Sequence, residues 1–366
     1  MTPASPAADY RLAPEALARY HELRDEAIRA AMAAGEKAMP DYYRRLDARG
    51  RAACAEDIGF HLDFLLPTLE EGDLSPFSAY LSWLAEVLAS RGVPLTSLDA
   101  SLGHLADFFA ASMGTAGDPV VAALRAASAQ DAATHAKTEE NCPAPWPESD
   151  AYREAALRGN HREANAALTD SLNRTGTTPA RTAIHVIQPA LYEIGRLWQQ
   201  NKVSVAREHL ATAVSVTVLA QQMATAAIPP GNGLRALFAC PSGNQHALGL
   251  RMVANAFELD GWDSYYLGEN VPVTSLISQV RELRPHLLGL SATLPQHLRS
   301  LRESIAALRA AMGNDCPKIL IGGLVFNRFP LLARACHADL LATDAENAVS
   351  QARQLFPGTL RGRSDD

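Results

Sequence analysis

Residues 234–268, LRALFACPSGNQHALGLRMVANAFELDGWDSYYLG, decide how the second half of this chain folds. The apolar run LRALFACP is typical of a buried strand, an amphipathic helix is predicted over 247–259, and a second strand, DSYYLG, follows it. His246 falls in the loop between the first strand and the helix. The pattern indicates a βαβ unit, because two parallel strands need a long crossover connection, usually a helix.

The same alternation continues toward the end of the chain. Apolar runs recur at 286–294, 318–326 and 338–344, and further helices are predicted over 273–284, 296–313, 327–336 and 344–356. Apolar strands that alternate with helices indicate a parallel sheet covered on both faces, here a flavodoxin-like, doubly wound α/β domain over 233–357. Ligands of such domains bind at the carboxyl ends of the strands, where His246, Ser291 and the glycine pair 322–323 fall.

The first part of the chain is predicted to be helical throughout. Amphipathic periods without any strand signal predict an all-α N-terminal domain over 1–140. The proline-rich stretch CPAPWP indicates a linker, which we place at 141–150. Long amphipathic segments with short connections then predict an antiparallel helical bundle over 151–230.

Composition excludes several classes of function. The chain has 366 residues, of which 48% are hydrophobic and 20% charged, as in a globular protein of two or three domains. Its net charge of −7 argues against a nucleic-acid surface, so no direct DNA binding is expected. No apolar run approaches the roughly 20 residues that span a membrane, and MTPASPAADYRLAPEALARY lacks the order of a signal peptide. Five scattered cysteines without a CxxC pair fit the cytoplasm and offer no thiolate metal site.

The loop after the first predicted strand reads NQHALG over 244–249. It contains no GxGxxG fingerprint, which argues against a bound dinucleotide. A loop histidine by itself is more often solvated or helix-capping than a ligand, but Gly249 leaves room for a bulky group at the first turn of the helix. The hexapeptide resembles the DxHxxG loop of cobalamin-binding domains. In that family the histidine ligates cobalt from below, and the nucleotide tail of the cofactor enters a slot beside the sheet.

This resemblance implies that His246 is the cobalt ligand, with Asn244, Gln245 and Gly249 beside it in the cofactor site. Asn244 is a departure from the family pattern, because methyl-transferring members carry an acid there that shares the proton of the histidine. An amide can orient an imidazole but cannot take up a proton. Ligation by His246 is therefore expected to be static.

The rest of the α/β domain follows the same resemblance. The stretch LDGWDSYYLGENVP is similar to the family pattern GxxVxxLGxxxP. Ser291 stands at the serine of the pocket for the nucleotide tail, and Gly322 and Gly323 match the glycine pair of that pocket. Thr293 takes the place of a leucine, either as a hydrogen-bonding partner of the tail or as a packed strand residue.

The predicted bundle carries a second motif, GRLWQQNKVSVAREHLATA, over 195–213. A core tryptophan and a solvated Glu-His pair would be ordinary in any bundle. The spacing, however, resembles the W-x9-EH signature of light-sensing cobalamin proteins, whose bundle covers the upper face of the corrin ring and encloses the 5′-deoxyadenosyl group. The residue types suit that role, because an aromatic wall stacks on adenosine and a carboxylate accepts hydrogen bonds from ribose.

The second resemblance implies that Trp198, Glu208 and His209 form a lid over the cofactor. Some photoreceptors of this kind carry a histidine directly after the tryptophan, which captures cobalt from above after illumination. Gln199 occupies that position here. His209 or water would therefore have to fill the upper site.

Both motifs together predict a cytoplasmic, cobalamin-binding sensor that is not an enzyme and that responds to light through adenosylcobalamin. We expect its output to be a change in conformation or oligomeric state, passed to an unidentified protein partner or through self-association. A corrinoid methyl carrier of a methyltransferase system remains an alternative, as does a module that stores or binds cobalamin.

The predicted N-terminal domain has two possible relatives. Light-dependent repressors of the family begin with a basic helix-turn-helix, but 1–140 contain no clustered Arg/Lys recognition helix. Some multi-centre photoreceptors instead carry a helical, globin-like domain for a bilin. His61 and His104 lie within apolar helices and could line a pocket for such a second tetrapyrrole, although a histidine in that setting is usually a core residue.

Overall fold

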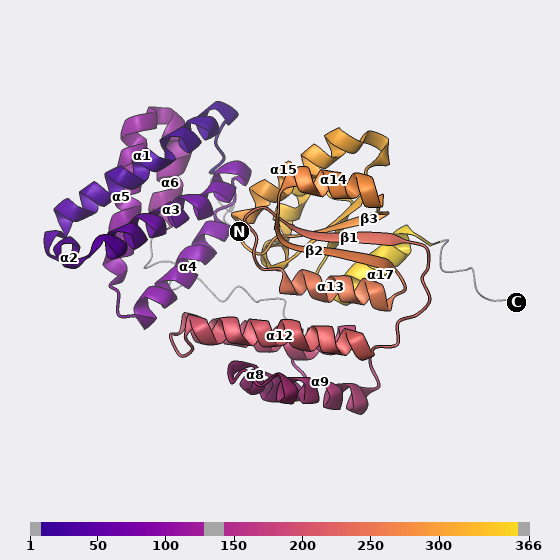
Figure 1. Cartoon of the computed structure of the whole chain (residues 1–366). Coiled ribbons are helices and arrows are strands. Elements are labelled where there is room, and N and C mark those ends of the chain that lie inside the picture. Colours follow the sequence, from indigo (N-terminus) through magenta and orange to yellow (C-terminus); the bar gives the residue numbers. More distant parts are fainter. Residues whose placement is uncertain (1–8, 128–142, 358–366) are drawn as a thin grey trace, which may run out of the picture. The chain divides into compact units, whose positions relative to one another are not determined.

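The computed structural model describes residues 9–127 and 143–357 (Figure 1). The chain divides into two compact units, Met1–Thr138 and Glu139–Asp366, here called the N-terminal and C-terminal units. Residues 141–142 of the predicted linker, and residues 1–8 of the segment predicted not to be a signal peptide, lie outside the described ranges. The four-part division of the chain stays a prediction.

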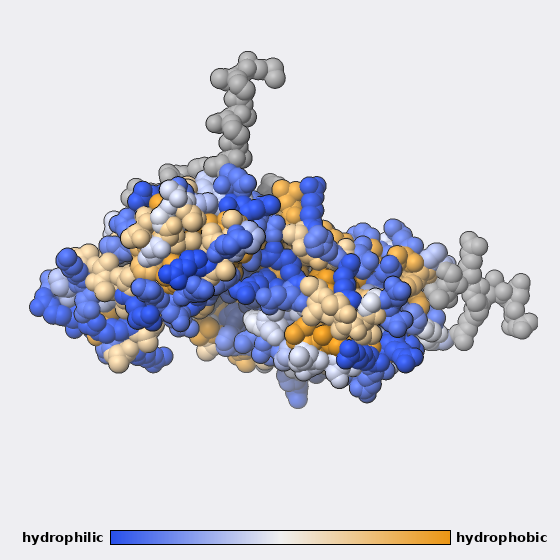
Figure 2. Space-filling view, turned by 90° about the horizontal axis from the view of Figure 1, so that it is seen from above, coloured by the Kyte–Doolittle hydropathy of each residue, from blue (hydrophilic) through white to orange (hydrophobic). Residues whose placement is uncertain are grey.

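Hydrophilic residues cover most of the face in Figure 2, and the hydrophobic residues on that face form scattered patches. Within 9–127 and 143–357, no helix is long and apolar enough to cross a membrane.

The described part of the N-terminal unit is helical, as its periodicity predicts. Its helices are α1 (Pro14–Ala38), α2 (Pro40–Arg45), α3 (Ala48–Glu71), α4 (Ser75–Ser90), α5 (Leu95–Met113) and α6 (Asp118–Ala126). Asp47 caps α3 by accepting a hydrogen bond from the Gly50 amide at 2.7 Å, and Gly72 ends this helix at a φ of 84°. The helices share one core, which includes Tyr20, Leu62, Phe77, Leu105 and Phe109.

The C-terminal unit begins with the predicted bundle. Its elements are α8 (Glu148–Leu157), α9 (His161–Thr175), α10 (Pro179–Thr182), a π-helical turn (Ala183–Ile187), α11 (Gln188–Gln199) and α12 (Val205–Thr225). The π-helical turn precedes Pro189, which has no N–H to bond the carbonyl of His185. The Trp146 amide donates to that carbonyl instead, at 2.9 Å. The irregular turn therefore ties α11 to the segment before α8.

A five-stranded sheet follows, and every pairing in it is parallel. Its strands are β1 (Arg235–Pro241), β2 (Asp263–Val271), β3 (Leu287–Ser291), β4 (Lys318–Gly322) and β5 (Leu340–Ala342). They lie in the order β2-β1-β3-β4-β5. This order and the helices around the sheet confirm the predicted flavodoxin-like, doubly wound α/β fold.

Helices cover both faces of the sheet (Figure 1). Two of them, α13 (Leu248–Leu259) and α17 (Ala345–Leu355), pack on one face, and α14 (Val273–Leu283) and α15 (His297–Met312) pack on the other. The bundle lies against the α13 and α17 layer, with α12 alongside α13. Met252, Ala256 and Ala345 belong to the same hydrophobic core as the bundle. Bundle and α/β domain are therefore joined by shared apolar packing.

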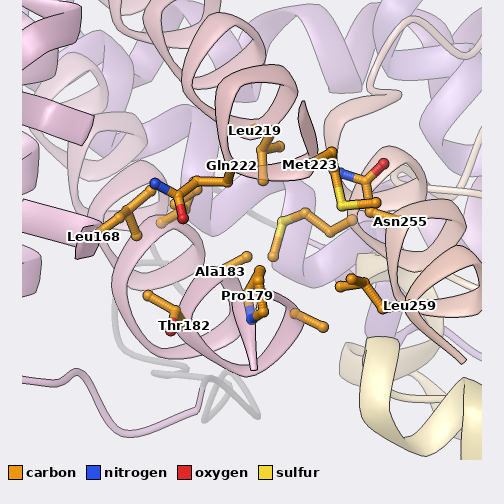
Figure 3. A pocket seen from close by; sticks show the side chains of 12 residues that line it. Leu168, Pro179, Thr182, Ala183, Leu219, Gln222, Met223, Asn255 and Leu259 are labelled. Atoms are coloured by element: carbon orange, nitrogen blue, oxygen red, sulfur yellow. The ribbon is translucent and has the colours of Figure 1, made fainter. Parts of the chain in front are cut away.

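The seam between bundle and α13 contains a small pocket (Figure 3). The side chains around it come from α9, α10, the π-helical turn, α12 and α13, and include Leu168, Pro179, Leu219, Met223 and Met252. Its cavity volume of about 10 Å³ is at the lower limit for one water molecule. No residue predicted for the cofactor site lines it. The pocket is a packing defect of the seam and not a cofactor site.

Two predictions near the fourth strand are wrong. The apolar run 318–326 is not one strand, because β4 ends at Gly322 and residues Leu324–Arg328 form the short helix α16. The predicted helix over 327–336 is a 3₁₀ segment, Pro330–Cys336. Gly323 turns the chain at a φ of 110°, and Pro330 lacks the amide that a continuing helix would use.

Candidate functional site

Strands β1 and β3 are neighbours, so the loops that follow them meet at one edge of the sheet. Asn244 joins these two loops and is fully buried. Its side-chain Nδ2 donates to the Ser291 carbonyl at 2.8 Å, and its Oδ1 accepts from the His246 amide at 3.0 Å. The side-chain amide of Asn244 therefore bonds the backbone of both loops, at Ser291 and at His246, the predicted cobalt ligand.

The end of β2 braces the same loop. The Asn270 amide donates to the Asn244 carbonyl at 3.0 Å, and the Asn270 side-chain Oδ1 accepts from the Gly243 amide at 2.8 Å. Asn270 has a φ of 52°, a left-handed conformation that asparagine tolerates better than most residues. The sequence analysis missed Asn270. A polar asparagine at the predicted end of a strand could have indicated it.

His246 is exposed to solvent, and its pKa lies below the usual value of a histidine. The neighbouring Gln245 is exposed as well. Protein atoms around the ring nevertheless remove enough water to lower the pKa of His246, and the carboxylate of Glu208 partly offsets this effect. An accessible neutral imidazole is the form of histidine that ligates a metal.

A second histidine lies beside His246. The ring centroids of His246 and His297 are 6.2 Å apart, with the planes tilted by 41°. His297 is only 6% exposed, and its Nδ1 accepts hydrogen bonds from the amides of Thr293 and Leu294 at 3.4 and 3.2 Å. Burial, and then the neighbouring His246, lower the pKa of His297 to about 4. Sequence reasoning missed His297, since nothing distinguishes it from any first residue of a helix.

Glu208 and His209 lie in the first turn of α12. The Glu208 Oε2 and the His209 Nδ1 are 2.5 Å apart, and the Thr212 hydroxyl donates to the other carboxylate oxygen at 3.1 Å. The side chain of His209 is 75% exposed, whereas that of Glu208 is 32% exposed. A carboxylate in the first turn also interacts favourably with the helix dipole. The pair therefore has a fixed carboxylate and an accessible imidazole.

A tight turn connects this pair to Trp198, which is half-buried in the last turn of α11 together with Gln199. The Asn201 amide donates to the Trp198 carbonyl at 2.9 Å, and the Lys202 amide donates to the Leu197 carbonyl at 2.9 Å. The two parts of the W-x9-EH signature thus lie on consecutive helices on either side of one turn. The effect of Glu208 on His246 links this bundle motif electrostatically to the α/β loop.

The predicted tail pocket lies at the ends of β3 and β4, where Ser291 and Gly322 are the last strand residues. A Cβ on Gly323 would overlap the carbonyl oxygen of Ala292 and lie 3.0 Å from the Ser291 hydroxyl. A Cβ on Gly322 would lie 2.9 Å from the Ala342 carbonyl oxygen. Both glycines are therefore required by the close packing of these loops.

Two other predicted residues differ in how tightly they are held. Thr293 is half-buried, and its amide is one of the two that donate to His297 Nδ1. Gly249, by contrast, is exposed at the first turn of α13, and a Cβ there would meet no atom within 4 Å. The packing of the chain around Gly249 therefore does not require a glycine at this position.

The histidines predicted for a second tetrapyrrole lie in the N-terminal unit. His61 is buried, and its Nδ1 is 2.8 Å from the Tyr80 hydroxyl. Tyr80 stacks on Phe64 with ring centroids 3.9 Å apart, and burial lowers the pKa of His61 to about 4. His61 is thus a hydrogen-bonded core residue. His104 is half-buried on α5, and its Nε2 has no hydrogen-bond partner.

Within the part of the chain that the structure describes, no group of three or more His, Cys, Asp or Glu side chains is arranged to hold a metal ion.

Comparison with known proteins identifies two B12 binding domains. Residues 234–353 match one B12 binding domain family and residues 149–221 match a second. The chain is similar to two proteins of Myxococcus xanthus, the HTH-type transcriptional repressors CarA and CarH. It is 32% identical to CarA over 54% of this chain and 66% of CarA, and 27% identical to CarH over 48% of this chain and 59% of CarH.

The chain is also similar to the dimethylamine corrinoid protein 1 of Methanosarcina mazei. That identity is 22% over 49% of this chain and 83% of the corrinoid protein. The chain spans less than two thirds of the length of either repressor. The matched residues are those of the C-terminal unit, in which the two motifs meet.

Proposed function

Because the chain belongs to the cobalamin-binding photoreceptor and sensor family, we propose that it senses light through bound adenosylcobalamin. The response is a change in conformation or oligomeric state, passed to a protein partner or to a second copy of the chain. In this proposal the protein is not itself an enzyme, does not bind DNA directly and works in the cytoplasm.

The proposal is carried by the meeting of the two B12 binding domains in one compact unit. The lid motif is in the first domain and the ligand loop is in the second, and the Glu208 carboxylate is close enough to His246 to affect its pKa. A cofactor held by both domains would therefore couple its own state to the way they pack. This is the requirement for a sensor.

The residues fit cobalamin. His246 is exposed, and its lowered pKa favours the neutral imidazole that ligates a metal, while Gly249 leaves open space at the helix start. Ser291, Thr293, Gly322 and Gly323 are at strand ends, where the nucleotide tail would enter, and Asn244 and Gln245 complete the loop around His246.

Bound adenosylcobalamin supplies a cobalt–carbon bond that visible light breaks. Trp198, Glu208 and His209 would enclose the adenosyl group in the dark. Loss of that group would remove the contacts that hold this lid in position. The exposed imidazole of His209, held by Glu208, would then be free to approach the cofactor.

Scattering measured during size exclusion tests the proposal. Full-length protein loaded with adenosylcobalamin in the dark is expected to change mass or radius after green light, because the lid is released. Protein loaded with hydroxocobalamin, which has no adenosyl group, is the control and should not respond. Identical dark and light profiles, with photolysis confirmed by the absorption spectrum, would contradict the sensor and favour a storage or binding module.

The Trp198→Ala variant is expected to lose affinity for adenosylcobalamin more than for hydroxocobalamin. Stacking of a base on an aromatic side chain is worth about 1–3 kcal/mol, so the selective loss should be roughly 5- to 150-fold. Calorimetric titration with both cofactors measures it. Trp146→Ala is the control, a tryptophan in the segment before α8 whose ring stacks on that of His185 with centroids 4.7 Å apart. Equal losses for both cofactors in Trp198→Ala would mean that Trp198 is an ordinary core residue.

The similarity to the dimethylamine corrinoid protein favours a second candidate, a corrinoid methyl carrier. Asn244 argues against it, because its amide cannot exchange a proton with His246 and is engaged by backbone. Added methyl donors should produce cobalamin turnover if the chain is a carrier, and none if it is a sensor.

A second tetrapyrrole such as a bilin stays a prediction. His61 is enclosed by the core around Tyr80, so a ligand at His61 would require these helices to open. The absorption spectrum of the purified protein would contain bilin bands in addition to those of cobalamin if this occurs.

A further inference from the structure

His246 has a buried aromatic neighbour that comes from a different strand end. His297 is the first residue of α15, and its ring centroid lies 6.2 Å from that of His246. The two loops that carry these rings follow β1 and β3, which pair side by side. His297 is buried and His246 is exposed, so the buried ring forms part of the wall behind the exposed one.

Asn244 occupies the position from which a carboxylate would orient the histidine in related domains, but its amide is engaged elsewhere. Its oxygen accepts from the backbone amide of His246, and its nitrogen donates to the backbone carbonyl of Ser291. These bonds fix where the backbone of His246 lies. They leave the rotation of the imidazole about its side-chain bonds to other contacts.

His297 itself is held firmly. Its Nδ1 accepts from the amides of Thr293 and Leu294, so the proton of the neutral ring is on Nε2. His297 is the first residue of α15, and burial of its side chain prevents the ring from turning outward. The orientation of His297 is therefore set by the 293–297 backbone and can be passed to a neighbouring ring.

We propose that His297 is a positioning residue for the cobalt ligand, whose fixed ring limits the orientations that the His246 imidazole can take. The part of this inference that concerns cobalt rests on the proposed function. The part that concerns the two rings does not, and it can be measured on protein without cobalamin. His297 would thus supply the orientation that an acid provides elsewhere, without a group that exchanges protons with the ligand.

Two substitutions separate the ring of His297 from its role in the loop. His297→Asn keeps an acceptor near the position of Nδ1 for the Thr293 and Leu294 amides, but it removes the imidazole ring. His297→Phe keeps an aromatic ring and loses the acceptor. His286→Asn is the matched control, because the Nδ1 of His286 also accepts a backbone amide, that of Arg235 at 3.0 Å, before β3 rather than after it.

The first measurement uses nuclear magnetic resonance on the full chain without cobalamin, with isotope-labelled histidine. His297→Asn is expected to shift or broaden the imidazole signals of His246, and His286→Asn is expected to leave them unchanged. His297→Phe should preserve more of the restraint on His246 than His297→Asn does, provided that it folds. Unchanged His246 signals in His297→Asn would overturn the proposal.

The second measurement adds cobalamin in its Co(II) form and records affinity and the paramagnetic resonance spectrum. Residues that orient a metal ligand typically change metal affinity by about 10- to 100-fold, so His297→Asn should weaken cobalamin binding by about 10-fold or more. The hyperfine splitting of the Co(II) signal by the histidine nitrogen should also decrease. Wild-type affinity and splitting in this variant would overturn the proposal. If the wild-type chain itself binds no cobalamin, the proposed function fails, whereas the ring pairing is still decided by the first measurement.

Discussion

His246→Ala is expected to lower the affinity for cobalamin by about 100-fold or more. Outer partners of a metal ligand are typically worth about 10- to 100-fold, and His246 is proposed to be the ligand itself. The remaining cofactor should be without a lower ligand or be ligated by its own dimethylbenzimidazole, which changes the visible spectrum. Titration followed by absorption measures both effects. The fold should be retained, because His246 is exposed and its structural bonds are made by its backbone.

The control for this variant is His161→Ala. His161 is an exposed histidine at the start of α9, outside the predicted site, and its removal should change neither affinity nor spectrum. Labelled histidine separates the two kinds of lower ligand in the wild-type protein, because its nitrogen differs from that of dimethylbenzimidazole. Unchanged affinity together with an unchanged spectrum in His246→Ala would rule out the assignment of the cobalt ligand.

Gly323→Ala is expected to destabilise the C-terminal unit by about 2–6 kcal/mol. Gly323 has a φ of 110° and a ψ of 169°, a region that is essentially restricted to glycine and costs other residues about 1–3 kcal/mol. The added methyl group would also overlap the Ala292 carbonyl, and overpacking of this kind typically costs about 1–3 kcal/mol more. The free energy of unfolding in denaturant, followed by a probe in the C-terminal unit, measures the loss.

The matched control is Gly249→Ala, a glycine to alanine change in the same domain. Gly249 lies in the first turn of α13, and a Cβ there would meet no atom within 4 Å. Alanine favours a helix over glycine by up to about 1 kcal/mol, so the protein without cofactor should be as stable as wild type or slightly more stable. A Gly323→Ala protein that unfolds at the wild-type denaturant concentration would contradict the account of the β4 turn.

The sequence predicted the features that depend on local pattern. Apolar runs separated by helical periods predicted five strands and their crossover helices, because the central strands β1, β3 and β4 are buried along most of their length and must be apolar there. The positions of His246, Ser291 and Gly322 at strand ends followed from the same runs. The family was predicted from the residue spacing of two motifs, and the comparisons confirm it.

The misjudged elements show where local pattern is insufficient. The run 318–326 has no polar residue after Lys318, yet the helix α16 begins at Leu324, because Gly323 turns the chain after Gly322. Apolarity indicates burial, and both a central strand and a helix that packs on the sheet are buried. The bundle similarly contains a π-helical turn that periodicity does not reveal, since it depends on Pro189 and on the Trp146 amide that bonds the released carbonyl.

The sequence by itself determined the five strands, most of the helices, their order, and which loops lie at the ligand-binding edge. Only the tertiary structure decided what the side chains in those loops contact. It directed the amide of Asn244 to the backbone of Ser291, 47 positions away, and set the ring of His297 beside His246. The physical reason is that strand period and helix period are properties of neighbouring residues. Contacts between loops depend instead on the pairing of β1 with β3 and on backbone bonds that fix each loop separately.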